Sequence, residues 1–180
     1  GDIIITAHQP AGIFYGIQTL LQMLPPEIKN SQKQKGIDWT VPCTDITDKP
    51  QFAWRGLMLD VSRHWFTKEE VKKYIDELAE YKMNVFHWHL TDDQGWRLEI
   101  KSLPRLTEVG AWRAPRVGQW WQRAPQQPGE ETTYGGFYTQ EDVKEVLAYA
   151  AERYVRVIPE IDVPGHSLAA LVAYPDLACI

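Results

Sequence analysis

The sequence predicts an α/β fold with a parallel sheet in its second half. From Gln51 onward, three strand-like stretches, at residues 56–63, 85–91 and 155–163, are separated by segments with helical spacing of apolar residues. Parallel strands need long crossover connections, usually helices, so strands that alternate with helices indicate a parallel sheet. In such folds the functional side chains collect at the carboxyl ends of the strands.

Residues 1–50 have a different pattern and are expected to be the C-terminal part of a small α+β accessory domain. The stretch Ile3–Ala7 reads as a strand because it is rich in β-branched residues, and residues 39–44 offer a second short extended piece. Pro10 opens a helix that Pro25 and Pro26 end. One helix and two short strands bury little surface, so we expect further sequence upstream of this unit.

Residues 51–180 are expected to be the N-terminal part of a barrel domain. Its first helix begins with a capping box at Thr67 and Glu70, and its second with a weaker box at Thr139 and Asp142. The buried face of the first helix is predicted to hold Val71, Tyr74, Ile75, Leu78 and Ala79, and that of the second Val143, Val146, Leu147, Ala150 and Tyr154. The segment from residue 94 to residue 138 is rich in Trp, Pro and Gly and long enough to be functional or to contain small elements of its own.

Polar residues occupy one face of all three strands. Alternation places Leu57, Leu59 and Val61, then Phe86, Trp88 and Leu90, then Val157, Ile161 and Val163 toward the helices. The opposite faces carry Asp60, then His87 and His89, then Glu160 and Asp162. Buried charges must be paired, so for Asp60, His87 and Glu160 a mutually satisfied polar layer is the favoured interpretation. Asp92, Asp162 and His166 lie nearer the carboxyl ends of the strands, which favours an active-site role for them.

Composition excludes some partners. The net charge is −5 and Lys and Arg form no run, which argues against nucleic acid or an anionic membrane surface as a partner. The sequence has no apolar run of about 18 residues that could span a membrane. Cys43 and Cys179 show no metal-ligand spacing and are predicted to be unpaired thiols, so they do not decide the compartment.

Four blocks of residues carry a family pattern. They are Trp54–His64 (WRGLMLDVSRH), Asn84–Arg97 (NVFHWHLTDDQGWR), Gly135–Thr139 (GGFYT) and Pro159–Ser167 (PEIDVPGHS). Together they resemble the family-20 glycoside hydrolases, the β-N-acetylhexosaminidases. The resemblance covers residue 51 to the end, and the helix from Pro10 resembles part of the accessory domain that precedes the barrel in that family.

The resemblance implies a (β/α)8 TIM barrel, of which this chain holds about the first three strands. It implies a retaining hydrolase of terminal β-linked N-acetylglucosamine or N-acetylgalactosamine, in which the substrate's acetamido oxygen is the nucleophile and no cofactor or metal takes part. Asp92 and His166 resemble the family's pair that hydrogen-bonds toward the general acid, with Asp162 fixing the imidazole. Arg55 and His89 are the predicted sugar-binding residues. Trp112, Trp120 and Trp121 could form an aromatic sugar platform, although loop packing is the favoured interpretation.

One departure from the family pattern is important. The family takes its general acid and its acetamido-orienting carboxylate from an adjacent Asp-Glu pair after the fourth strand. The only Asp-Glu pair here is Asp76-Glu77, within the first predicted helix. We therefore expect a fragment that is inactive alone and that associates with other copies through its open sheet edges.

Two other functions stay open. His87-x-His89 places two imidazoles on one strand face, as in metal-dependent amidohydrolases, but a full ligand set is not evident. A sugar-binding relic without catalysis is the other alternative, because a fold does not guarantee a chemistry. For the compartment, a secreted or periplasmic location is favoured over the cytoplasm.

Overall fold

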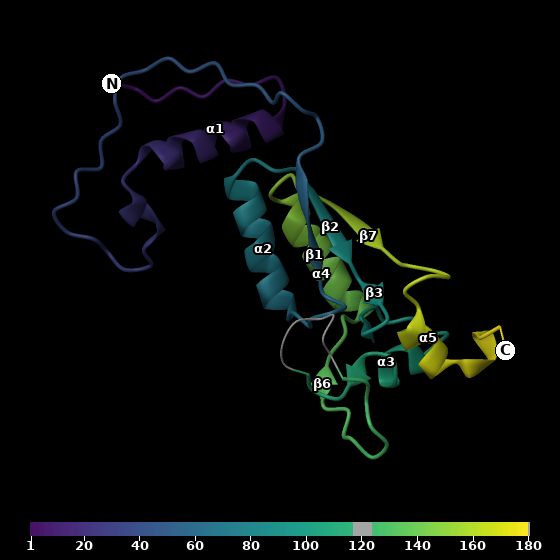
Figure 1. Ribbon diagram of the computed structural model, residues 1–180. Helices are drawn as coiled ribbons and strands as arrows, with labels where there is room; N and C mark the ends of the chain where they lie inside the picture. The colour runs from purple at the N-terminus through teal and green to yellow at the C-terminus, as the bar shows by residue number, and fades with distance from the viewer. Residues whose placement is uncertain (117–123, 180) are drawn as a thin grey trace.

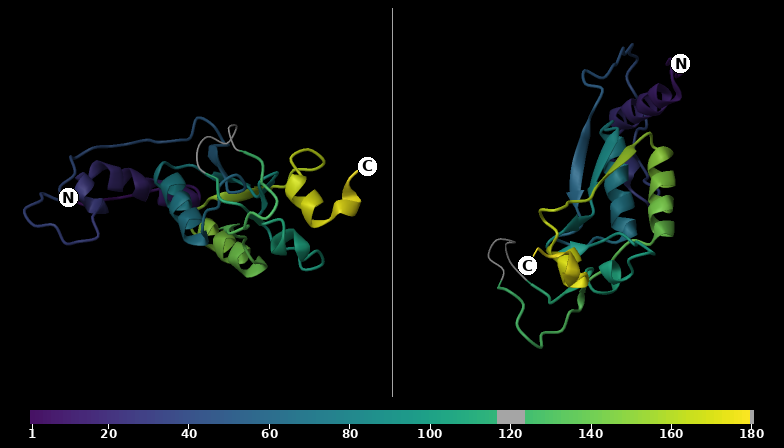
Figure 2. Two further views of the ribbon diagram at one scale, coloured as in Figure 1. Left: turned by 60° about the horizontal axis from the view of Figure 1, so that its bottom comes forward. Right: turned by 90° about the vertical axis from the view of Figure 1, so that its right-hand side faces the viewer.

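The computed structural model describes residues 1–116 and 124–179. Its centre is a sheet of three parallel strands in the order β1 (Gly56–Asp60), β2 (Val85–His89) and β7 (Arg156–Glu160). Helices α2 (Lys68–Glu80) and α4 (Gln140–Ala151) pack side by side on one face of this sheet, as the right-hand view of Figure 2 shows. The predicted α/β class and the β-α order are therefore confirmed.

Both predicted capping boxes are present. The Thr67 hydroxyl accepts from the backbone N–H of Glu70, and the Glu70 carboxylate accepts from the backbone N–H of Thr67. Thr139 and Asp142 repeat this arrangement at the start of α4. Each box satisfies amide groups that the first helical turn leaves free, so the helices begin where the sequence indicates.

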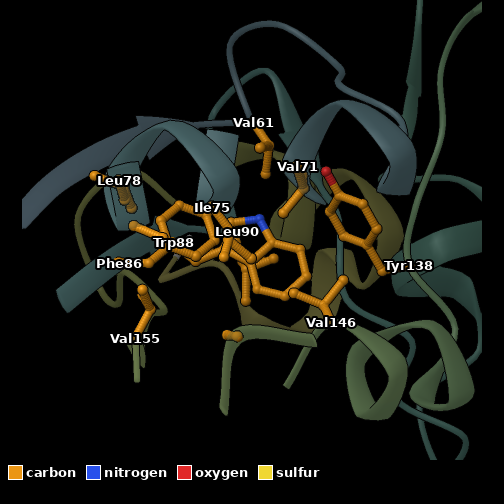
Figure 3. Packing of buried hydrophobic residues seen from close by; sticks show 12 residues of the cluster. Val61, Val71, Ile75, Leu78, Phe86, Trp88, Leu90, Tyr138, Val146 and Val155 are labelled. Carbon is orange, nitrogen blue, oxygen red and sulfur yellow. The ribbon is translucent and has the colours of Figure 1, made fainter. Parts of the chain in front are cut away.

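The main core lies between the sheet and the two helices (Figure 3). Phe86 and Trp88 from β2 stack at a centroid distance of 5.7 Å, and Tyr138 contacts Trp88 at 4.6 Å. The fully or nearly fully buried members labelled in Figure 3 are Val61, Val71, Ile75, Leu78, Phe86, Trp88, Leu90, Tyr138, Val146 and Val155. Burying such large side chains stabilises the fold by roughly 1.5–3 kcal/mol each, so this layer fixes the position of β2.

Some residues predicted to be buried are not. Leu57 is 51% exposed on the edge strand β1, while Ile161 and Val163 lie beyond the end of β7 and are also exposed. Leu147 and Tyr154 are exposed on and after α4. These residues have the predicted period, but they lie at the edges of the layer, and even Tyr154, whose ring lies 5.5 Å from that of Phe14 in α1, stays partly exposed.

The first fifty residues contain one long helix, α1 (Pro10–Met23), as predicted. The predicted strands at residues 3–7 and 39–44 are absent, since these segments are extended without a ladder partner among the described residues. A strand is stable only when its backbone groups pair with another strand, which β-branched composition alone does not ensure. Helix α1 lies at the amino end of the sheet (Figure 1), where Lys82 donates to the Thr19 hydroxyl at 2.6 Å.

The long segment after β2 contains several short elements, as expected. Strand β3 (Thr91–Asp92) pairs with β4 (Gly95–Trp96), and β5 (Trp112–Arg113) pairs with β6 (Tyr134–Gly135), both antiparallel. In the sequence, helix α3 (Arg105–Glu108) lies between β4 and β5. These elements and α5 (Leu168–Ala173) gather at the end toward which the parallel strands run (Figure 1).

The remaining elements are short. Turns of 3-10 helix span Pro26–Lys29 and Pro175–Leu177. Trp120 and Trp121, proposed above for a sugar platform, lie outside the described residues. Cys43 and Cys179 are exposed and unpaired, as predicted. Among the helices described, none has both the length and the apolar character that crossing a membrane requires.

Candidate active site

Asp92 is the centre of a cluster of charged side chains at the carboxyl end of the sheet. It lies in β3, which follows β2 with only Leu90 between them, and its side chain is 1% exposed. One carboxylate oxygen, Oδ2, contacts Nη2 of Arg63 at 2.6 Å and Nε2 of His89 at 3.0 Å. A buried carboxylate costs several kcal/mol unless it is paired, so these two contacts explain how Asp92 is kept inside the fold.

Arg63 is held by the turn that ends β1. The Asp60 carboxylate accepts from the backbone N–H groups of Ser62 and Arg63, both at 3.0 Å, which bends the chain after the strand. Nη1 of Arg63 then returns to Asp60 at 2.7 Å. Arg63 is not among the site residues predicted from the sequence, although its position at the carboxyl end of a predicted strand is the signal that could have identified it.

His89 lies between two carboxylates across neighbouring strands. The register pairs Asp60 with His89 and His89 with Glu160. Nδ1 of His89 contacts Glu160 at 2.9 Å, and Nε2 of His87 reaches the same Glu160 oxygen. Burial by itself lowers the pKa of His89, but contacts with Glu160 and Asp92 outweigh it, so the pKa is raised above the usual 6.5. The predicted row of acid, imidazole and acid is therefore present.

The same contacts act on Glu160 in the opposite direction. Partial burial favours the neutral acid, yet the contacts with His89 and His87 prevail and lower the pKa of Glu160 below its usual value. Glu160 is therefore ionised at neutral pH. The two imidazoles and the carboxylate compensate one another, which is the polar layer that the sequence suggested.

His166 reaches the cluster from the segment after β7. Its Nδ1 lies 3.3 Å from Oδ1 of Asp92 and 3.9 Å from Oδ2 of Asp93, while its side chain is 57% exposed. The Asp93 carboxylate accepts from the backbone N–H of Leu168 at the start of α5, which ties the two segments together. The structure therefore brings Asp92 and His166 into contact.

Asp162 is placed differently from the expectation. Its backbone N–H donates to the Thr91 hydroxyl at 3.0 Å, and its carboxylate lies near His89 and Glu160. Within the described residues we find no contact between Asp162 and His166. The carboxylate that contacts the His166 imidazole is Asp92 instead.

Arg55 lies at the other end of the sheet. It precedes β1, where its Nε donates to the carbonyl of Lys82 at 2.9 Å, its Nη1 donates to the carbonyl of Phe52 at 2.8 Å, and its guanidinium lies over the ring of Tyr15. The five-residue strand β1 separates it from Arg63, a span of roughly 17 Å at the usual rise per residue. The structure thus does not bring Arg55 to the Asp92 cluster, and the predicted sugar contact of Arg55 lacks a geometric basis.

Arg97, for which the sequence predicted no role, holds together the segments around the site. It is fully buried and donates only to backbone carbonyls: Val61 at 3.1 Å, Ser62 at 2.8 Å, Gly136 at 3.2 Å and Ala111. Burial lowers the pKa of Arg97 to about 10, so it stays charged at neutral pH. These bonds join the turn that carries Arg63 to the segments around β5 and β6.

The metal alternative can be tested against this geometry. Within the described residues, two groups of side chains could each place three ligand atoms within 4.8 Å of one another: His89, Glu160 and Asp162, and Asp92, Asp93 and His166. In the first group His89 already contacts Glu160, and in the second Asp92 is already neutralised by Arg63. Because these contacts compensate the charges without an ion, the geometry favours a polar layer over the amidohydrolase-type site proposed for His87 and His89.

Two family profiles match this chain. The profile described as glycosyl hydrolase family 20, catalytic domain, matches residues 52–180, and the profile described as glycosyl hydrolase family 20, domain 2, matches residues 1–49. The chain belongs to glycosyl hydrolase family 20. The first profile covers every residue of the Asp92 cluster.

Curated family-20 proteins extend this result. The beta-hexosaminidase of Porphyromonas gingivalis is 52% identical over 177 residues, which are 98% of this chain and 21% of that protein. The N,N'-diacetylchitobiase of Vibrio harveyi is 41% identical over 177 residues, 96% of this chain and 19% of that protein. The chain thus spans about a fifth of the length of these relatives.

Solved family-20 structures share the fold. A mutant Streptomyces plicatus β-hexosaminidase in complex with the product N-acetylglucosamine is 47% identical with a TM-score of 0.83, covering 97% of this chain and 32% of that one. The β-N-acetylhexosaminidase of Bacteroides fragilis is 46% identical with a TM-score of 0.74, covering 96% and 30%. The fold is therefore an accessory domain part followed by part of a TIM barrel.

Proposed function

We propose that this chain supplies the first part of the active site of a β-N-acetylhexosaminidase. Such an enzyme removes terminal non-reducing N-acetylglucosamine or N-acetylgalactosamine from β-glycosides, with retention and with the 2-acetamido group as nucleophile. The observation that supports this most is the buried Asp92, held by Arg63 and His89 and in contact with His166, at the carboxyl end of a family-20 barrel segment. We also propose that residues 1–50 form part of the accessory domain and residues 51–180 part of the barrel.

Arg63 is proposed to bind the hydroxyl groups of the terminal sugar. A guanidinium has five N–H donors in a planar fork, and Arg63 directs only some of them at Asp60 and Asp92. Its side chain is 25% exposed, so part of it is accessible from the mouth of the barrel. Arg63 is thus proposed for the sugar-binding role predicted for Arg55. His89, also predicted to bind the sugar, is nearly fully buried between carboxylates and is proposed instead to support Asp92.

Asp92 and His166 are proposed to act on the general acid. A carboxylate facing Nδ1 favours the tautomer with its proton on that nitrogen, which leaves Nε2 as the basic atom of the imidazole. An imidazole held in this way can accept a hydrogen bond from a carboxylic acid and set its pKa. Asp162 is proposed to act on Asp92 indirectly. Its carboxylate lies beside His89 and Glu160, and His89 in turn contacts Asp92.

The general acid itself is not among these 180 residues. The one Asp-Glu pair of the sequence, Asp76-Glu77, lies in α2, and Asp76 binds Tyr149 and Arg153 on the helix surface. We therefore propose that this chain alone does not hydrolyse a chromogenic β-N-acetylglucosaminide. Repurified chain that retained turnover, and lost it on Asp92→Ala, would overturn this proposal.

A chimera tests the proposed function. The corresponding segment of the Porphyromonas gingivalis beta-hexosaminidase, 52% identical, can be replaced by this chain. We expect the chimera to hydrolyse the chromogenic substrate, and Asp92→Asn to lower kcat at least about a hundredfold, because the imidazole loses its charged partner. Asp93→Asn is the matched control, since that side chain is 41% exposed, and should stay within about threefold.

The outcomes separate the alternatives. A folded chimera that binds N-acetylglucosamine without turnover would support the sugar-binding relic. Activity that depends on added zinc and is abolished by His87→Ala would support the metal-dependent alternative. Equal losses for the two aspartate variants would remove Asp92 from the site.

Self-association is proposed as well. Within the described residues, β1 and β7 are the outer strands of an open sheet, and Leu57 and Met58 are each 51% exposed there. Unpaired strand edges with apolar side chains favour association with another chain. Light scattering coupled to size exclusion should find dimers or larger species, whereas a compact monomer at all concentrations would contradict the proposal.

A further inference from the structure

The backbone of the turn that carries Arg63 is bound by arginine side chains from other segments. Arg97 donates to the first two carbonyls of the turn, those of Val61 and Ser62. The next carbonyl, that of Arg63 itself, accepts from Nη2 of Arg113 at 3.0 Å. The pKa of Arg97 is lowered first by its burial and then by the nearby charge of Arg113. Three successive carbonyls thus bind two cations that would otherwise repel each other.

Arg113 is in turn held by Tyr134. The two residues lie opposite each other in the register of β5 and β6, and the Arg113 guanidinium lies over the Tyr134 ring, 4.5 Å from its centroid. Such a cross-strand pair is stabilised by the attraction of a cation to an aromatic face. The Tyr134 hydroxyl also accepts from the backbone N–H of Trp65 at 3.1 Å. The pair therefore binds the main chain at Arg63 and again two residues later.

The strands β5 and β6 lie directly against this turn. A Cβ atom on Gly136, the residue after β6, would lie 2.4 Å from the Trp65 ring, so this close approach requires a glycine. Arg97 joins both strands to the turn, because it also donates to the carbonyls of Gly136 and Ala111. The backbone from which the Arg63 side chain extends is therefore positioned by β5 and β6 as well as by β1.

We propose that Arg113, held over Tyr134, is a positioning residue that sets the direction in which the Arg63 guanidinium meets the terminal sugar. This inference rests on the sugar-binding role proposed above for Arg63. Arg113 holds the main chain of Arg63 and not its side chain, so its loss leaves the charge beside Asp92 in place. It changes the aim of a planar fork of donors, whose hydrogen bonds depend on direction and tolerate little displacement.

The test is a double-mutant cycle in the chimera described above, with steady-state kinetics on the chromogenic β-N-acetylglucosaminide. Arg113→Met removes the donor to the Arg63 carbonyl and should raise KM at least about fivefold, with kcat within about twofold. Arg113→Lys retains a charged donor and should recover part of this loss. In an Arg63→Lys background, which already lacks the planar fork, Arg113→Met should change KM by less than about twofold. A residue that only stabilises the fold would have the same effect in both backgrounds.

Arg116→Met is the matched control. Arg116 lies three residues after Arg113 and also donates to backbone carbonyls, but those of residues 115, 124 and 125 in its own segment. This variant should keep KM within about twofold. Tyr134→Phe is a milder second variant, because it keeps the ring beside Arg113 and loses only the hydroxyl that binds the N–H of Trp65. It should raise KM about twofold to threefold even if Arg113→Met does not fold.

The outcomes separate this inference from the proposed function. An unchanged KM in Arg113→Met and Tyr134→Phe, or equal KM increases in both backgrounds, overturns the positioning role and leaves the sugar contact of Arg63 standing. If Arg63→Lys itself leaves KM unchanged, the sugar contact is wrong and the positioning role is overturned with it. In the 180-residue chain, independently of turnover, the Nε–H NMR signal of Arg63 should shift in Arg113→Met and stay in place in Arg116→Met. An Arg63 signal that does not respond to Arg113→Met also overturns the inference.

Discussion

Arg55 precedes β1 and Arg63 follows it, and the two guanidinium groups have different kinds of partner. At the amino end, Arg55 donates to the backbone carbonyls of Phe52 and Lys82 and lies over the ring of Tyr15. At the carboxyl end, Arg63 contacts the carboxylates of Asp60 and Asp92. The first set of contacts joins α1 to the start of the sheet, and the second neutralises charges that the fold has buried.

The two sets of partners show that buried ionised carboxylates are found at the carboxyl end of β1 and not around Arg55. The hydrogen bonds from Arg55 to backbone carbonyls stabilise the start of the sheet without burying a carboxylate. At the carboxyl end, Asp92 is buried beside His89, and an exposed imidazole, His166, contacts the same carboxylate. Clusters of this kind are typical of functional sites, because their environment sets the pKa values that a reaction needs.

The largest expected effect separates Asp92 from its neighbour Asp93. Asp92→Ala leaves Arg63 and His89 without their buried counter-charge, so we expect the free energy of unfolding to fall by about 3 kcal/mol. Asp93→Ala removes a half-exposed carboxylate that accepts one backbone N–H, and should cost about 1 kcal/mol or less. Urea unfolding followed by tryptophan fluorescence measures both values. If the two variants lost the same free energy of unfolding, the buried charge of Asp92 would not be what stabilises the carboxyl end of the sheet.

A smaller effect concerns pH. The raised pKa of His89 means that its contribution to stability is complete below the usual value of 6.5 and is lost as pH rises through the folded-state pKa. The lowered pKa of Glu160 means that its contribution is present above the usual value of 4.5 and is lost as pH falls through the folded-state pKa. Stability from this pair is therefore greatest between those two values.

Urea midpoints at about pH 5.5 and about pH 8.5 test this expectation. The parent chain should be more stable at the lower pH, and the difference should shrink in His89→Gln, which retains a polar side chain but cannot titrate. Arg55→Lys, at the opposite end of the sheet, should keep the parent's pH dependence. An unchanged difference in His89→Gln would assign the effect to another group.

Much of the fold was predictable because local signals agreed with the final packing. The capping boxes at Thr67 and Thr139 mark helix starts through contacts made within four residues, so no tertiary information is needed. Strand alternation placed His89 and Glu160 on one face, and the parallel register then brings them together. The expected strand at residues 3–7 failed because pairing needs a partner strand, which its own sequence does not report.

The candidate site was only partly predictable. Asp92 and His166 were selected and are in contact, since both follow the carboxyl ends of strands. Arg55 was preferred to Arg63 although both flank β1, and the rule on carboxyl ends favours Arg63. Arg97 could not be recognised, because its partners are backbone carbonyls from three separate segments and carry no side-chain signal in the sequence.

The comparison of the two arginines provides the most direct test, in the active chimera described above. Arg63→Lys keeps the charge beside Asp92 but loses the planar fork of donors, so it should lower kcat/KM at least about tenfold, mainly through KM. Arg55→Lys is the matched variant and should stay within about twofold. Steady-state kinetics with the chromogenic β-N-acetylglucosaminide gives both ratios in one experiment. A large loss for Arg55→Lys with none for Arg63→Lys would contradict the placement of the sugar site at the carboxyl end of β1.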